Sequence, residues 1–486
     1  MKTPVVLICL ASLLVIFTSC YRMRASKGGG EIKNIPGRTV NASDILLAPG
    51  YQIESVASGL TFPTAIAFDG EGTLHFIETG YSYGEVWTEP KLIRLSSNGE
   101  KRIIAQGSKN GPWNGLAYHS GNFYVSEGGA LEGGKILKIT PSGEMTTLVD
   151  GLPSIGDHHT NALVIRAGHI YFGQGTATNS AVVGEDNASF GWLKRQKDFH
   201  DIPCGDVVLT GENYESANVL TDDPNDRAST GAFVPFGTKT SPGQVIKGKV
   251  PCTGAIMRIP LEGGPAEVVA WGLRNPFGLA LSADETLYTT ENAFDDRGSR
   301  PVWGAGDALW EVKQDTWFGW PDFSEGLPIK NDEEFKAPSS KAVKPLLQKN
   351  PGEPPRPVAI FGVHASACGL DFSKDAAFGH EGEAFVAEFG DMAPGVGKVL
   401  EPVGFKIVRV NTNNGVIRDF AVNKGKRNGP ASWLKHGGLE RPVSVKFDPS
   451  GKTLYVVDFG ILKMTDEGPQ PQQNTGVIWK ITKRGL

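Results

Sequence analysis

One pattern of apolar and polar positions recurs six times along this chain. Each copy has a turn, a short apolar segment, a second turn that usually contains Gly, and a second apolar segment that ends in an acid or amide. The paired segments are residues 63–68 and 74–77, 114–118 and 123–126, 161–165 and 170–173, 275–281 and 287–290, 367–372 and 384–387, and 441–447 and 454–457. Short apolar segments between such turns are typical of buried β-strands.

Further segments between the copies alternate apolar with basic or polar residues, which is the pattern of half-buried outer strands. Clear examples are residues 92–95, 135–139, 255–259, 406–410 and 477–481. A repeated unit that cannot bury its own faces must stack against its neighbours, as the blades of a propeller do. The sequence therefore predicts an all-β, six-bladed β-propeller over residues 48–486, with loop insertions near 180–253 and 324–362.

Composition agrees with this prediction, and the charge excludes one class of partner. The 486 residues include 62 Gly and 32 Pro, as expected for a chain with many turns. The formal net charge is -5, whereas proteins that bind nucleic acid need a basic surface to replace the phosphate counterions. We therefore expect no nucleic-acid partner.

The N-terminus has the pattern of an export signal. Lys2 precedes an apolar run over residues 4–17, which is too short to span a membrane comfortably, and a short stretch ending in Cys20 follows. The segment resembles a bacterial lipoprotein signal in which Cys20 becomes lipidated, with an ordinary signal peptide as the alternative. We expect a signal over residues 1–20, a flexible tether over 21–47, and a periplasmic or cell-surface protein that reaches the membrane through its lipid alone.

Besides Cys9 and Cys20 in the predicted signal, the cysteines are Cys204, Cys252 and Cys368. In an exported protein, Cys204 and Cys252 could bridge and pin the first insertion. Cys368 lies in an apolar run, as a small core residue does. No pair has the close spacing of a zinc site or of a covalently attached haem, so we expect neither group.

The polar residues that end the paired segments occupy matching places: Glu78, Glu127, Gln174, Glu291, Glu388 and Asp458. In a propeller, matching strand ends gather near one rim of the central channel. Several carboxylates at close range repel each other unless a cation offsets their charge. The pattern therefore predicts a polar ring that holds a cation, with solvated channel residues as the alternative interpretation.

A second set of polar residues stands at the start of three copies. Asp157 and His158 precede the third copy, Arg274 and Asn275 begin the fourth, and Arg441 begins the last. A His beside a carboxylate can act as a general base, because the acid orients the imidazole and stabilises its protonated form. The shared position favours a site at His158 over a simple loop role.

These stretches resemble the signatures of the glucose/sorbosone dehydrogenase family. The resemblance rests on Asp157-His158 with residues 163–165, on residues 274–279, and on Gly319-Trp320-Pro321, and it extends loosely over residues 48–483. Residues 363–365, 404–410 and 441–443 are closer to the sorbosone-dehydrogenase-like branch. The family consists of soluble six-bladed propellers that bind pyrroloquinoline quinone (PQQ) with calcium.

The resemblance implies PQQ- and calcium-dependent oxidation of a sugar, or of a related polyol or aldehyde. His158 would remove the hydroxyl proton while hydride passes to the quinone, and Asp157 would orient His158. Arg274 and Asn275 would contact carboxylate and carbonyl oxygens of the cofactor. Electrons would leave to a separate acceptor, because the chain has no haem motif.

The resemblance also implies metal ligands, and the sequence departs from the family elsewhere. Backbone carbonyls of Asn292 and Ala293 would hold the catalytic calcium, and Asp307 is a candidate for a second calcium. Phe277 stands where the glucose enzymes have a Gln near the cofactor. Residues 388–391 contain two acids where the family often has a basic residue, so loss of PQQ binding is an open alternative. The candidates to replace that basic residue are Lys398, Lys406 and Arg441.

Two other function classes fit the same architecture. In calcium-dependent lactonases, axial Glu and Asn residues hold the metal that polarises an ester, and the candidates here are Glu78, Asn114 and Asn161. That interpretation leaves Arg274 and His158 without a role. The other class is a non-catalytic surface propeller that binds glycan or protein, as in the related hedgehog-interacting proteins.

Overall fold

The computed structural model describes residues 37–82, 86–189, 191–330, 332–337, 342–392, 399, 401–465 and 468–485. The predicted signal over residues 1–20, with its Cys20, lies outside the described residues, as do residues 21–36 of the predicted tether. Within the described ranges, no helix is long and apolar enough to cross a membrane.

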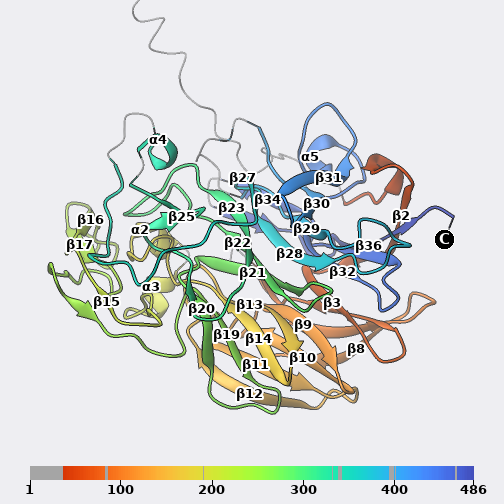
Figure 1. The fold of residues 1–486 in the computed structure, drawn as a ribbon, viewed down its shortest axis with the longest axis horizontal. Coiled ribbons are helices and arrows are strands. Elements are labelled where there is room, and N and C mark those ends of the chain that lie inside the picture. The colour runs from red at the N-terminus through yellow and green to blue at the C-terminus, as the bar shows by residue number, and fades with distance from the viewer. Residues whose placement is uncertain are drawn as a thin grey trace, which may run out of the picture.

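The protein is a six-bladed β-propeller, as the repeat predicts (Figure 1). The six innermost strands form a closed ring, because each contacts the next and the last contacts the first. They are β3 (Pro63–Phe68), β9 (Trp113–His119), β13 (Thr160–Arg166), β21 (Asn275–Leu281), β28 (Ala367–Phe372) and β32 (Pro442–Phe447). The first segment of each recurring copy therefore lines the axis.

Three more strands complete each blade. The second strands are β4 (Leu74–Glu78), β10 (Asn122–Glu127), β14 (His169–Gln174), β22 (Leu287–Asn292), β29 (Ala384–Glu388) and β33 (Thr453–Asp458). The third are β7 (Lys91–Leu95), β11 (Gly134–Ile139), β19 (Ala255–Pro260), β23 (Gly306–Glu311), β30 (Lys406–Asn411) and β36 (Gly476–Lys483). The fourth strands, counted outward, are β8 (Lys101–Gln106), β12 (Met145–Leu152), β20 (Glu267–Trp271), β27 (Ala359–Val363), β31 (Val416–Asn423) and β2 (Tyr51–Leu60).

Neighbouring blades pack through their apolar side chains. Ile77 and Leu92 of the first blade share one buried cluster with Trp113 and Val125 of the second. Clusters of the same kind join the other neighbouring blades. Such burial stabilises the fold by about 25 cal/mol per Å2 of apolar surface removed from water. Contact between blades therefore holds the strand starts in register around the axis.

Residues near the N-terminus close the ring. The strand β2 is the outermost strand of the sixth blade and pairs antiparallel with the C-terminal strand β36. The strand β1 (Ile45–Leu47) follows the 3-10 helix η1 (Ala42–Asp44) and adds an edge strand beside β31. Arg38 donates hydrogen bonds to Asp458 and to the carbonyl oxygens of Gly438 and Thr475. The packed fold therefore begins before residue 48, within the stretch predicted as a tether.

The two insertions pack together beside the third and fourth blades, at the left of Figure 1. The first carries α2 (Glu185–Ser189), α3 (Trp192–Arg195), β15 (Val207–Val208), β16 (Asn213–Ala217), β17 (Arg227–Gly231) and β18 (Val245–Ile246). The second carries β25 (Phe323–Ser324), β26 (Leu327–Pro328) and α4 (Asp332–Phe335). Other short elements are β5 (Tyr81–Ser82), β6 (Val86–Trp87), β24 (Thr316–Trp317), α5 (Ala431–Leu434), β34 (Leu462–Thr465) and β35 (Gly468–Pro471).

Polar bonds and one disulfide hold the insertions in place. Leu209 forms a β-bridge with Leu347. A buried ion pair joins Arg300 Nη2 to Asp322 Oδ1 at 2.7 Å, and Asp322 also accepts the Leu347 backbone N–H. Cys204 and Cys252 form a disulfide with their Cα atoms 5.1 Å apart, which closes a loop of the first insertion. The insertions are thus a fixed cover beside the site described below.

Candidate functional site

The acids and amides that end the second strands bond near their own blades and form no cation-binding ring. Glu291 accepts hydrogen bonds from the Arg274 backbone N–H and the Trp310 indole, and Asp458 accepts the Arg441 backbone N–H at 2.9 Å. The comparable pairs are Glu78 with Thr61, Glu127 with Trp113, Gln174 with Thr160, and Glu388 with Lys406. Among the described residues, no group of three or more His, Cys, Asp or Glu could hold a metal ion. The predicted cation-binding ring is therefore wrong for the described residues: five of the six side chains accept hydrogen bonds from donors beside them, and Glu388 lies 4.0 Å from Lys406 Nζ.

Amide side chains instead join neighbouring blades around the axis. Asn114 Nδ2 donates to the Thr160 carbonyl oxygen at 2.9 Å, and Asn161 Nδ2 donates to Asn275 Oδ1 at 2.8 Å. Glu78 accepts the Thr61 backbone N–H at 2.8 Å. All three residues that the lactonase interpretation needs, Glu78, Asn114 and Asn161, thus bond to other parts of the protein. No observation in the described residues favours that interpretation.

His158 lies just before β13, at the face where the innermost strands begin, and only 6% of it is exposed. Its Nδ1 is 3.0 Å from the Thr176 carbonyl oxygen. A carbonyl oxygen only accepts, so Nδ1 carries the proton and Nε2 keeps its lone pair. Burial, with the positive charges of Arg274 and Arg297, lowers the pKa of His158 well below its ordinary value. The imidazole is therefore neutral at neutral pH and can accept a proton at Nε2.

Thr176 connects His158 to Arg274. The Thr176 carbonyl oxygen accepts the His158 backbone N–H at 3.1 Å, and the Thr176 N–H donates to the Arg274 carbonyl oxygen at 2.9 Å. The structure therefore brings the predicted base and the predicted cofactor-binding arginine together on one face. The sequence interpretation did not include Thr176.

The contact that orients His158 comes from Thr176 and not, as the resemblance implied, from Asp157. The Asp157 carboxylate accepts hydrogen bonds from Arg297 Nη2 at 2.7 Å and from Asn187 Nδ2 at 2.9 Å. Asp157 and His158 thus bond to different partners, with His158 held by Thr176. The role of Asp157 is to position Arg297.

Arg274 lies one residue before β21 and has a side chain that is 3% exposed. Each of its three side-chain nitrogens donates to a protein atom. Nε binds Asn179 Oδ1 at 3.1 Å, Nη1 binds the Asn292 carbonyl oxygen at 3.2 Å, and Nη2 binds Asp295 Oδ2 at 2.7 Å. The Asp295 carboxylate therefore binds the guanidinium group of Arg274, which was predicted to bind a carboxylate of the cofactor.

The predicted calcium ligands lie together at the end of β22. Asn275 Nδ2 donates to Asn292 Oδ1 at 2.9 Å. Ala293 N–H donates to Asp307 Oδ1 at 2.9 Å, and Asp307 Oδ2 accepts the Ala367 N–H at 2.8 Å. Asp307 thus braces the fourth blade against the fifth, and burial raises its pKa. Calcium at the Asn292 and Ala293 carbonyls stays a prediction.

Arg441 occupies in the sixth blade the place that Arg274 has in the fourth, but it is fully buried. Its Nη1 donates to the carbonyl oxygens of Gly390 and Asp391 at 3.0 and 3.2 Å. The guanidinium carbon lies 5.1 and 5.0 Å from the ring centroids of Phe389 and Phe405. Burial lowers the pKa of Arg441 to about 10. The structure therefore gives Arg441 a bracing role in place of the predicted cofactor contact.

Lys406 lies beside acids of its own blade, the fifth. Lys406 Nζ lies 2.7 Å from Asp419 on the fourth strand and 4.0 Å from Glu388. Burial raises the pKa of Glu388 to about 7. Phe277 packs against the apolar cluster that joins the sixth and first blades. Lys406 is thus also apart from the predicted cofactor contacts, and Lys398 lies outside the described residues.

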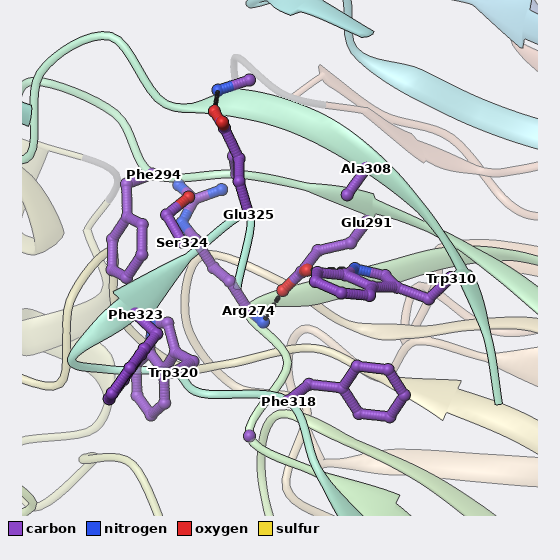
Figure 2. A pocket seen from close by; sticks show the side chains of 13 residues that line it. Arg274, Glu291, Phe294, Ala308, Trp310, Phe318, Trp320, Phe323, Ser324 and Glu325 are labelled. Atoms are coloured by element: carbon purple, nitrogen blue, oxygen red, sulfur yellow. Dashed lines mark hydrogen bonds between the residues drawn. The ribbon is translucent and has the colours of Figure 1, made fainter. Parts of the chain in front are cut away.

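A small pocket adjoins Arg274 on the fourth blade (Figure 2). Its main lining side chains are the rings of Trp310, Phe318, Trp320 and Phe323 and the carboxyl groups of Glu291 and Glu325. Burial raises the pKa of Glu291 to about 7, and Figure 2 shows this group reaching the backbone of Arg274. The space inside the pocket is only about 10 Å3, enough for roughly one water molecule and far below the roughly 300–1,000 Å3 of small-molecule sites. The pocket is therefore smaller than a quinone and a sugar together require.

Residues outside the sequence-predicted set hold the site together. Arg297 Nε lies 3.0 Å from Asp295 Oδ2, and Arg297 Nη1 lies 2.6 Å from Asp186 Oδ2. On the other side, His364 Nδ1 lies 3.5 Å from Asp295 Oδ1. In the sequence, only the acidic pair Asp295-Asp296 beside Arg297 marked this region. Contacts between loops follow no periodic pattern, so the sequence did not show which residues would pair.

A scan against known protein families and a search of curated proteins gave no match. Among solved structures, the holo form of the pyranose dehydrogenase PQQ domain from Coprinopsis cinerea has a TM-score of 0.54 and 15% identity, over 93% of this chain and 99% of that one. The calcium structure of a Trichoderma reesei carbohydrate-active enzyme of family AA12 has a TM-score of 0.53 and 16% identity, over 93% and 99%. A putative oxidoreductase (glucose dehydrogenase) from Thermus thermophilus has a TM-score of 0.50 and 16% identity, over 89% and 100%. At these identities the similarity shows the fold alone: this chain has the six-bladed propeller fold of PQQ-dependent sugar dehydrogenases.

Proposed function

We propose that this protein oxidises a sugar, or a related polyol or aldehyde, with PQQ and calcium bound at the face where His158 and Arg274 meet. The observation that carries the proposal is the neutral imidazole of His158, held through Nδ1 by Thr176 beside an arginine that binds a carboxylate. The fold shared with a PQQ domain and with a calcium structure supports it.

The donor set fits an anionic cofactor that carries carboxylates. Arg274 binds the Asp295 carboxylate through Nη2, while Asn179 and Asn292 fix its other two nitrogens. A planar guanidinium held in this way recognises carboxylates well. Asn275 uses one amide hydrogen on Asn292, and an amide group has two, so one donor remains for a carbonyl oxygen of the ligand. The carbonyls of Asn292 and Ala293 would hold calcium, whose charge offsets the acids of this region.

When bound, the quinone supplies the acceptor for hydride and calcium supplies a polarising charge. His158 takes the substrate hydroxyl proton at Nε2, and its Nδ1–H bond to Thr176 keeps the ring in the required orientation. Arg274 and Arg297 disfavour the protonated imidazole, so the proton passes on to solvent. The insertions beside the site limit the access of water, which strengthens these electrostatic effects.

The test is reconstitution of the purified protein. Protein freed of metal and quinone is mixed with PQQ and calcium, and aldoses are added with a redox dye. We expect dye reduction that needs both PQQ and calcium and that His158→Gln abolishes. His159→Gln is the matched control, because it removes the neighbouring imidazole, whose Nδ1 bonds to the Ser154 carbonyl. Binding of PQQ with no dye reduction across aldoses, polyols and aldehydes would contradict the proposed oxidation.

We also propose that the protein is exported and held to the membrane by a lipid on Cys20, and that it passes electrons to a separate acceptor. The order of residues 1–20 and the absence of a haem attachment spacing support this. Labelling cells with a radioactive fatty acid tests it: we expect label on the wild-type chain and none on Cys20→Ser. A labelled variant would refute the anchor.

A further inference from the structure

Among the described residues, the charged partner of the Arg274 guanidinium is Asp295, which is partly open to solvent. The Asp295 side chain is 22% exposed, whereas that of Arg274 is 3% exposed. The ion pair is short, with Arg274 Nη2 at 2.7 Å from Asp295 Oδ2. A ligand carboxylate that binds Arg274 Nη2 would lie next to the Asp295 carboxylate, and two carboxylates on one nitrogen repel each other.

The backbone of Asp295 is pinned, so movement is confined to its side chain. Asn179 Oδ1 accepts the Asp295 backbone N–H at 2.9 Å, and Asn179 Nδ2 donates to the Asp295 carbonyl oxygen at 2.7 Å. The same Asn179 Oδ1 also holds Arg274 Nε at 3.1 Å. Rotation of the Asp295 side chain would thus leave both the guanidinium and the loop in place.

Besides Arg274, two other groups already contact the Asp295 carboxylate. Arg297 Nε lies 3.0 Å from Asp295 Oδ2, and His364 Nδ1 lies 3.5 Å from Asp295 Oδ1. His364 Nε2 is buried and has no hydrogen-bond partner among the described residues. The residue has φ 61°, a left-handed conformation that costs energy for a side chain other than Gly, and such strain concentrates at functional sites.

We propose that Asp295 is a displaceable internal carboxylate, which pairs with Arg274 in the free protein and, when a carboxylate of the cofactor binds Arg274, leaves Arg274 and stays paired with Arg297 and His364. This inference rests on the proposed function, since it names how the anionic cofactor enters that site. Binding then exchanges one carboxylate for another on Arg274, and Asp295 keeps a positive partner throughout. The loop from Asp295 to Arg297 therefore sets the affinity for the cofactor.

The experiment measures ligand binding with no turnover. Quenching of tryptophan fluorescence reports PQQ binding in the presence of calcium, and Trp320, whose indole N–H donates to the Asn179 carbonyl oxygen, lies next to the site. Asp295→Asn removes the competing charge and keeps the shape, and we expect affinity to rise by about 10- to 100-fold. Asp296→Asn removes the same charge from the same loop and is expected to leave affinity within about threefold, because screening weakens more distant charges.

His364→Gln supplies the second arm of the test. In the wild-type background we expect it to weaken PQQ binding by several fold, because Asp295 loses a group with which it stays paired. In the Asp295→Asn background the same substitution is expected to have no effect, and this non-additivity is the signature of exchange. Equal or weaker binding to a folded Asp295→Asn protein, or additive effects of the two substitutions, would overturn the inference and make Asp295 a fixed brace.

A second ligand separates failure of this inference from failure of the proposed function. Benzene-1,3,5-tricarboxylate carries carboxylates but no quinone. If PQQ binds none of the proteins while the tricarboxylate binds Asp295→Asn more tightly than wild type, the exchange stands and the cofactor assignment falls. If neither ligand binds any of the proteins, both fall. If Asp295→Asn does not fold, the His364→Gln arm decides: unchanged PQQ affinity there overturns the exchange.

Discussion

Arg274 and Arg441 stand at the same place in two blades, and their surroundings show how one repeat serves two purposes. Each precedes an innermost strand, and each donates its backbone N–H to the acid that ends the second strand of its blade. Their guanidinium groups differ. Arg274 pairs with the Asp295 carboxylate, whereas Arg441 lies between aromatic rings and donates to carbonyl oxygens. The backbone role comes from the repeat, and the side-chain role comes from the loops.

The difference follows from what covers each arginine. The insertions bring Asn179 to Arg274, and the loop after β22 brings Asp295. At Arg441 the loop after β29 closes over the guanidinium, and burial lowers the pKa of Arg441 to about 10. A fully buried charge that donates to carbonyls and lies between rings braces the fold, while one paired with a partly exposed carboxylate can change partners. We therefore place chemistry on the Arg274 side and stability on the Arg441 side.

The largest expected effect tests whether the Arg274 side is reactive. His158→Gln removes the proton acceptor that lies beside Arg274, and loss of a general base lowers the rate by roughly 100- to 10,000-fold. The dye-reduction rate of the reconstituted protein measures this, and PQQ affinity is expected to stay within about threefold. If His158→Gln kept the wild-type rate, the general base would be another residue, and the chemistry would not be on the Arg274 side.

Next in size is a crossed pair of arginine substitutions. Arg441→Met leaves buried carbonyls without a donor at about 1–3 kcal/mol each, so we expect the free energy of unfolding to fall by roughly 3–5 kcal/mol. Arg274→Met leaves Asp295 with Arg297 and His364, so stability falls less, while PQQ affinity falls by roughly 30-fold or more, from the 2–5 kcal/mol of a truncated charged pair. Urea unfolding and quinone titration of both variants measure the crossing. If Arg441→Met and Arg274→Met lost equal stability and equal affinity, the two arginines would not differ in role.

The third prediction concerns the pH dependence of folding stability, and the titrating residue is His159, next to the reactive His158. Burial lowers the pKa of His159 from 6.5 to about 4. As the pH falls, the unfolded chain takes up this proton at about pH 6.5, whereas the folded protein takes it up only near pH 4. The free energy of unfolding that is present above pH 6.5 is therefore lost between pH 6.5 and 4. The loss is roughly 3 kcal/mol at 1.36 kcal/mol per pKa unit. We expect His159→Gln to lack this acid loss when the two unfolding free energies are compared from pH 7.5 to 4. Parallel curves would show that His159 does not titrate in this range.

Most of the propeller could be predicted from the sequence, because its strands follow a local period. The paired segments became the innermost and second strands, and five of the third strands were also recognised. The third strand of the fourth blade, Gly306–Glu311, was missed, since it is buried along nearly its whole length and therefore does not alternate. Asp307 within it was read as a metal ligand, although its oxygens brace two blades.

The site was only partly predictable. His158, Arg274 and Asn275 could be found because they stand at repeated positions next to strands. Their partners Thr176 and Asn179 come from the loop that enters the first insertion, and loop contacts are fixed by tertiary packing that leaves no pattern in the sequence. The acidic strand ends were misread for the opposite reason. Their repetition was clear, but repetition serves backbone bonding in each blade as readily as a shared ion.

The smallest expected effect compares the acids that end β22 and β29. Burial raises the pKa of both Glu291 and Glu388 to about 7, but Glu291 accepts hydrogen bonds from Arg274 and Trp310 while the partner of Glu388 is Lys406 at 4.0 Å. For Glu388 the raised pKa means that the folded protein is penalised as the pH rises from 4.5 to 7 and above. Glu388→Gln removes this cost, so we expect its unfolding free energy to match wild type near pH 4.5 and to exceed it by about 1–3 kcal/mol at pH 8.

Glu291→Gln is the matched control for Glu388→Gln, since it removes the same charge from the same place in the neighbouring blade. It exchanges one of two oxygen acceptors for an amide that cannot accept the N–H facing it, so we expect it to lower stability at pH 8 by about 1–3 kcal/mol. Urea unfolding of both variants at pH 4.5 and pH 8 gives the four values. A gain in both at pH 8 would mean that burial of charge outweighs hydrogen bonding on the Arg274 side as well, and that the two halves of the ring differ less than their arginines indicate.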